Sequence, residues 1–136
     1  MGGQRLRFRL LMLAAAAGFL AVALAIRAAS AGALESTGRL EQYSGTALYA
    51  SMTYVGVLAV WPRRSPWVAA TVAWAWCWAM ECFQLTGIPA ELATRSLLAR
   101  LVLGIRFDPV DLWWYPVGIV PLAVAHAWLR RRRPAP

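Results

Sequence analysis

The sequence is poor in cysteine and histidine and has no lysine. Cys77 and Cys82 are five positions apart, so on a helix their side chains would point about 140° away from each other. This spacing excludes a local disulfide, and with one distant histidine, His126, it provides no set of metal ligands. We therefore expect two buried thiols that pack as small hydrophobic side chains, with no metal and no cofactor.

Charge is also scarce, because charged residues make up 15% of the chain and hydrophobic residues 60%. The mean hydropathy is +0.52, and eight of the 136 residues are tryptophan. A single small soluble core could not bury this much apolar surface. The arginines stand between apolar runs rather than along one stripe, which excludes a typical nucleic-acid interface. No internal repeat or long linker appears, so we expect one membrane domain over residues 1–136.

Four apolar stretches are bounded by charged residues, and each is 17 to 22 residues long. A helix needs roughly 20 residues to cross about 30 Å of hydrocarbon. The pattern predicts an all-α fold, a polytopic membrane bundle of four transmembrane helices over about 10–26, 43–61, 67–88 and 111–129. The intervening segment, about 90–106, is too apolar for a plain loop and too short to cross twice. It predicts a short interfacial or re-entrant helix.

The arginines indicate how such a bundle is oriented. All fourteen basic residues are arginines, and nine would share the side of the two termini, against five on the other side. The positive-inside rule then predicts that both termini are cytoplasmic. The all-arginine composition, together with abundant alanine, is typical of a GC-rich bacterial genome, which indicates a bacterial plasma membrane. The first stretch also resembles a cleavable signal peptide ending in "AGA" at 31–33, but its long core and Arg27 favour retention as an anchor.

A few polar side chains interrupt the last two apolar stretches. Counted at 1.5 Å per residue, Glu81 and Gln84 of the third helix reach the same depth as Tyr115 and Gly118 of the fourth. Ionisable groups in hydrocarbon normally face a bundle interior or a water-filled cavity. We therefore expect two inward stripes that face each other near the outer surface: Trp74, Cys77, Glu81 and Gln84 on one helix, and Asp111, Tyr115 and Gly118 on the other.

The same residues also permit purely structural roles. Glu81 and Gln84 are equally suited to hydrogen bonds that tie helices together. Arg95, in the interfacial segment, is placed to reach Glu81 or an anionic headgroup, or to form a surface ion pair with Asp111. The run "RRRR" at 130–133 is a stop-transfer signal whose charge would also attract anionic lipid.

The string "ECFQL", then Arg95, then "LVLGIRFDPVDLWWYPVGI" resembles the bacterial membrane family catalogued as domain of unknown function 2809, a relative of the VanZ-like proteins. Where that family tends to carry an acidic residue after a glycine, this chain has Thr46. The resemblance implies a helical membrane fold and a link to antibiotic resistance, without a defined reaction. The positions it marks here are Glu81, Gln84, Arg95, Gly104, Phe107, Asp111, Tyr115 and Gly118.

Three functions fit this pattern, and the first is preferred. The protein would bind a membrane lipid or a lipid-linked envelope precursor, without catalysis, in an outer-leaflet cavity. The alternative is a membrane-embedded hydrolase or transferase with Glu81 as general base and Arg95 stabilising negative charge, although no nucleophile motif supports it. A small transporter acting as an oligomer is the third. The predicted ligand-binding residues are Glu81, Gln84, Arg95, Asp111, Tyr115 and Gly118.

Overall fold

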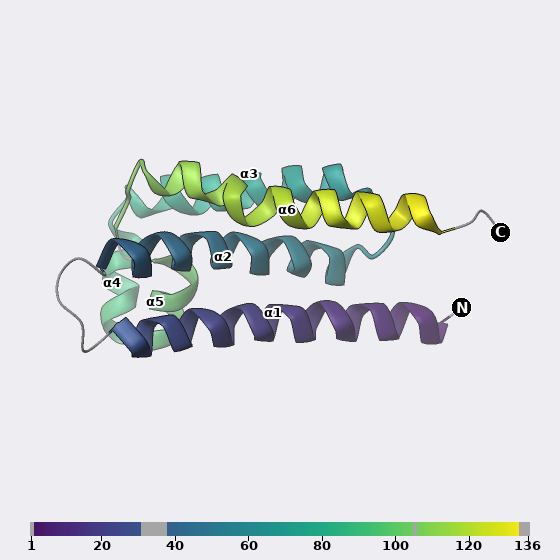
Figure 1. Cartoon of the computed structure of the whole chain (residues 1–136). Coiled ribbons are helices and arrows are strands. Elements are labelled where there is room, and N and C mark those ends of the chain that lie inside the picture. Colours follow the sequence, from purple (N-terminus) through teal and green to yellow (C-terminus); the bar gives the residue numbers. More distant parts are fainter. Residues whose placement is uncertain (1, 31–37, 105, 134–136) are drawn as a thin grey trace.

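The computed structural model describes residues 2–30, 38–104 and 106–133, and all regular elements in these ranges are helices. Figure 1 shows α1, α2, α3 and α6 running along the length of the molecule, with α4 and α5 at the end opposite the two termini. The predicted all-α fold is confirmed. The elements are α1 (Gly2–Ser30), α2 (Gly38–Val60), α3 (Pro66–Gln84), α4 (Ile88–Arg95), α5 (Leu97–Leu103) and α6 (Asp111–Arg132).

Two helices, α1 and α6, are long and apolar enough to cross a membrane, and no other helix in the described ranges meets the same measure. Of the four predicted spanning helices, these two therefore have the length and composition of a membrane span. The predicted cleavage motif at 31–33 lies outside the described residues.

The third helix ends at Gln84, earlier than the predicted residue 88. Gly87 has a φ of 76°, in the left-handed region that glycine adopts without steric cost. Pro89 follows inside the first turn of α4, where its missing N–H group costs nothing. At the other end, Ser65 Oγ accepts a hydrogen bond from the Val68 N–H at 3.2 Å, so a serine cap starts α3.

The predicted single helix over 90–106 is two helices instead. Ser96 is extended, with φ −145° and ψ 123°, so it ends α4 and begins α5. Its Oγ accepts a hydrogen bond from the Ala99 N–H at 3.3 Å, which caps α5. The break changes the direction of the chain between Arg95 and Arg100.

Small side chains form the inward face of α3. Ala69, Ala73, Cys77 and Glu81 recur at every fourth position and are buried, whereas Trp74, predicted to face inward, is 45% exposed. Small residues let helix backbones approach closely, so the tryptophans remain on the outer surface. The rest of the core comes from α2 and α6: Ala50, Tyr54, Val55, Leu58, Tyr115, Ile119 and Ala123.

Gly118 lies where α6 crosses α2. A Cβ atom at this position would overlap the Ala47 carbonyl group and lie 2.8 Å from its carbon. Ser51 Oγ, also on α2, donates a hydrogen bond of 2.8 Å to the Gly118 carbonyl oxygen. Gly118 therefore faces inward, as its stripe predicted, and its missing side chain admits the backbone of α2.

Candidate functional site

A cavity of about 540 Å³ lies at the end of the bundle opposite the termini. Residues from α1, α2, α3, α5 and α6 and from the segment before α6 contribute to its wall. We call it the acid–arginine cavity, because three acids and three arginines line it: Glu81, Asp108, Asp111, Arg27, Arg100 and Arg106.

Glu81 ties α3 to α6 and to the segment before α6. Its side chain is 2% exposed. The Tyr115 hydroxyl donates a hydrogen bond of 2.5 Å to Oε1, and the Asp108 N–H donates one of 3.4 Å to Oε2. This contact confirms the prediction that the Glu81 and Tyr115 stripes pack together. Both carboxylate oxygens therefore have protein donors.

Gln84, at the end of α3, forms a hydrogen bond with α5. Its Nε2 donates a hydrogen bond of 2.8 Å to the Leu103 carbonyl oxygen. The next residue, Gly104, has φ 71° and ψ −173°, a conformation almost restricted to glycine, and a Cβ atom there would overlap the Gln84 amide. Gln84 Oε1 is buried and has no hydrogen-bond partner in the described ranges. Within the described part of the chain, this acceptor on a cavity-lining residue is therefore unused.

The two aspartates are held by side chains of α2. Gln42 Nε2 donates to Asp108 Oδ2 at 2.7 Å and to Asp111 Oδ1 at 3.4 Å. Thr46 Oγ1, one turn further along α2, donates to Asp111 Oδ1 at 3.1 Å. Thr46, noted as a departure from the family pattern, therefore supports an aspartate. Gln42 and Asp108 were not among the predicted site residues, although the four-residue spacing of Gln42 and Thr46 places these two on one helix face.

The arginines of the cavity differ from the one predicted. Arg95 pairs with Glu91, one turn earlier on α4, at 3.3 Å, and their side chains are 75% and 70% exposed. The structure therefore contradicts the expected contacts of Arg95 with Glu81 or Asp111. Arg100 and Arg106, both exposed, line the cavity instead. Arg95 is not among the described residues that line the cavity.

The carboxylates of the cavity and its arginines differ in the hydrogen bonds that they make within the protein. Its three carboxylates accept hydrogen bonds from protein groups. In residues 2–30, 38–104 and 106–133, no three His, Cys, Asp or Glu side chains lie close enough together to hold a metal ion. Arg100 and Arg106 present the strongest donors at the wall, suited to phosphate or carboxylate oxygens.

The family whose model matches this chain is described as "Protein of unknown function (DUF2809)", and the match covers residues 36–119. The chain belongs to this family. The matched region contains Gln42, Glu81 and Asp108, and hence most of the acid–arginine cavity, but it excludes α1. No curated protein and no solved structure matches the chain.

Proposed function

We propose that the chain is a multi-pass protein of the bacterial plasma membrane in which α1, α2, α3 and α6 all cross the bilayer. With 19 to 29 residues, these helices are about 28 to 43 Å long, enough for roughly 30 Å of hydrocarbon. Large apolar side chains such as Trp67, Trp76 and Trp113 are 48–81% exposed, whereas Glu81 is buried. This arrangement suits a lipid solvent better than water.

Both termini are cytoplasmic in this proposal. They lie at one end of the bundle, together with the turn that joins α2 to α3 (Figure 1). Nine arginines belong to that end and five to the other, which favours the first as the cytoplasmic end. The acid–arginine cavity then faces the outer leaflet. The arginines at the terminal end are Arg5, Arg7, Arg9, Arg63, Arg64 and Arg130 to Arg133.

The cavity binds the headgroup of a membrane lipid or a lipid-linked envelope precursor, consistent with a VanZ-like envelope role. The observation that carries this proposal is the contrast within the cavity wall. Its acids are held by protein donors, whereas Arg100 and Arg106 are exposed. Gln84 belongs to the same lining, and its Oε1 has no hydrogen-bond partner among the described residues. A phosphate group would satisfy the arginines, and a hydroxyl or ammonium group on the same headgroup would donate to Gln84.

Binding fits Glu81 better than catalysis does. A general base must reach the proton that it removes, and its lone pairs must be available. Glu81 is 2% exposed, and it already accepts hydrogen bonds from Tyr115 and from the Asp108 N–H. Hydrolase or transferase activity is therefore the second candidate, and turnover of a bound lipid would establish it. An oligomeric transporter is the third.

Lipid analysis of the purified protein tests the proposal. We expect the full chain, extracted in a mild detergent, to co-purify with one phosphate-containing headgroup class that is lost in Arg100→Ala/Arg106→Ala. Arg95→Ala is the matched control, because Arg95 lies on the same end of the molecule but pairs with Glu91. If all variants retain the same lipids in the same amounts, the headgroup proposal is wrong.

Cysteine labelling from outside the cell tests the topology. In a background with Cys77→Ala and Cys82→Ala, we expect Arg39→Cys and Arg95→Cys to react with an impermeant maleimide, and Arg64→Cys and Arg132→Cys to be protected. The opposite pattern would place the acid–arginine cavity in the cytoplasmic leaflet. Reaction at all four positions would refute the multi-pass arrangement.

A further inference from the structure

A second hollow, of about 810 Å³, lies at the terminal end of the bundle, between α1 and α6. Helix α1 packs against α2, and α6 packs against α2 and α3, but α1 and α6 make little direct contact. The space between them is therefore a groove with α2 as its floor. Tyr54, Val55 and Leu58 of α2 form this floor. The volume of the groove lies in the range of about 300 to 1,000 Å³ that is typical of ligand sites.

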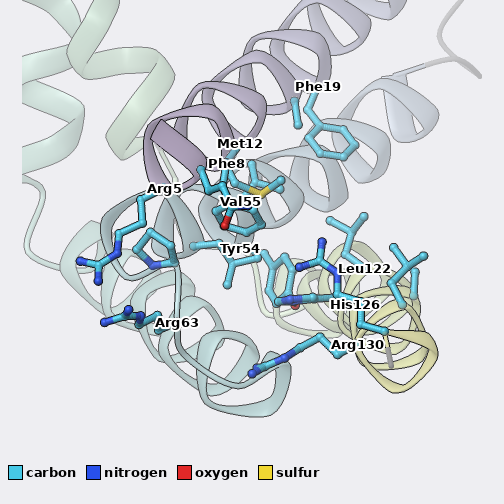
Figure 2. A pocket seen from close by; sticks show the side chains of 17 residues that line it. Arg5, Phe8, Met12, Phe19, Tyr54, Val55, Arg63, Leu122, His126 and Arg130 are labelled. Atoms are coloured by element: carbon cyan, nitrogen blue, oxygen red, sulfur yellow. The ribbon is translucent and has the colours of Figure 1, made fainter. Parts of the chain in front are cut away.

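The groove has a basic mouth and an apolar interior, so we call it the arginine groove. Arg5, Arg63, Arg130 and Arg133 line it, and the described residues of its lining include no aspartate or glutamate. Figure 2 shows Arg5 and Arg63 at the left and Arg130 at the lower right, near His126. Phe19 lies at the top, and Phe8 and Met12 lie between it and Arg5. The four arginines come from three separate segments that converge only in the folded chain.

One polar contact lies within this apolar lining. The Tyr54 hydroxyl and His126 Nδ1 share a hydrogen bond of 3.0 Å, and Tyr54 is 1% exposed. The residues from Arg5 to Phe19 are all in α1, so the groove extends roughly 21 Å along the helix at 1.5 Å per residue. One leaflet of a bilayer contributes half of about 30 Å of hydrocarbon. In the proposed membrane placement, the groove is therefore long enough to run from the headgroup level through the hydrocarbon of one leaflet.

We propose that the arginine groove is a binding site for an anionic phospholipid of the leaflet at the terminal end. The phosphate contacts Arg5, Arg63 and Arg130, and one acyl chain lies along Phe8, Met12 and Phe19. Cationic groups without local acids attract an anionic headgroup, and the apolar walls bind the chain that a soluble anion lacks. This inference relies on the proposed membrane placement, but not on the ligand of the acid–arginine cavity.

Native mass spectrometry of the full chain in detergent, titrated with phosphatidylglycerol or with phosphatidylcholine, tests the site. We expect one tightly bound phosphatidylglycerol and at least about tenfold weaker phosphatidylcholine binding. Arg5→Ala/Arg130→Ala is expected to weaken phosphatidylglycerol binding by about tenfold or more. The matched control is Arg7→Ala/Arg131→Ala, which removes the same charge from the same helices at positions outside the groove lining.

Two further arms separate the possible occupants. Ala125→Trp, at an exposed position that lines the groove, should exclude the acyl chain and weaken phosphatidylglycerol to a similar degree without lowering the melting temperature. Millimolar glycerol phosphate should not displace the lipid. The proposal would be overturned if both arginine double variants lost phosphatidylglycerol binding equally, or if glycerol phosphate displaced the lipid. It would also be overturned if the protein were a dimer that Ala125→Trp dissociates while lipid binding stays unchanged. Arg100→Ala/Arg106→Ala tests the cavity independently, and it should leave phosphatidylglycerol binding unchanged.

Discussion

At the acid–arginine cavity, arginines stand beside three carboxylates, whereas at the arginine groove they stand beside aromatic and aliphatic side chains. Residues of α5 form part of the cavity wall, and hydrogen bonds through Glu81, Gln84 and Asp111 organise it. The groove is formed by a helix that packs on one neighbour and leaves its other side open. Charge alone therefore does not define a ligand. The acids and apolar groups around each arginine decide which anion it can bind.

The largest expected effect is at the helix crossing on which both ends depend. Gly118→Leu places a side chain against the Ala47 backbone, which cannot move aside as a flexible side chain can. We expect a loss of about 3 kcal/mol or more, and loss of ligand binding at both ends. Thermal melting in detergent measures it. Gly56→Ala, with nothing within 4 Å of the added Cβ, should melt at or slightly above the parent temperature.

Gly104→Ala should damage one end and spare the other. The position combines φ 71° with a predicted overlap with the Gln84 amide, so we expect a local cost of about 1 to 3 kcal/mol. Hydrogen exchange should become faster in α5 and stay unchanged in α1. Gly87→Ala is the control, because it shares the positive φ but has nothing within 4 Å. Equal exchange rates in the two variants would show that the contact with Gln84 is unimportant.

A pair of tyrosine variants compares the two ends directly. Tyr115→Phe removes the donor to Glu81, and Tyr54→Phe removes the partner of His126. Each should cost about 1 kcal/mol, as buried hydrogen bonds between membrane helices do. We expect Tyr115→Phe to weaken headgroup binding in the cavity alone, and Tyr54→Phe to weaken phosphatidylglycerol binding alone. Losses at both sites in either variant would mean that the two ends are energetically coupled.

The smallest effect should come from Arg95→Ala. Its ion pair with Glu91 joins two exposed side chains four residues apart, and such pairs contribute about 0.3 to 0.5 kcal/mol. Melting temperature and binding at both ends should stay within error of the parent protein. A large loss of headgroup binding would mean that Arg95 contributes to the cavity despite its ion pair with Glu91.

The sequence predicted the helical fold and the contact between Glu81 and Tyr115 because both follow from periodicity and depth. It did not predict where the segment after α3 would break. Ser96 adopts an extended backbone that ends one helix and begins the next. A single helix was predicted there, with Arg95 in the site, whereas Arg100 and Arg106 line the cavity. Gln42 was missed because the aspartates it binds lie 66 and 69 positions away.

What the sequence by itself determined is the set of apolar helices, the position of most turns and the uneven distribution of arginines. These depend on neighbouring residues, through helix periodicity, serine capping at Ser65 and glycine at positive φ. Only the tertiary structure decided that Gly118 meets Ala47, that Thr46 supports Asp111, and that α1 leaves a groove beside α6. Those contacts join residues far apart in the chain, and their geometry is set by how closely the helix backbones can approach.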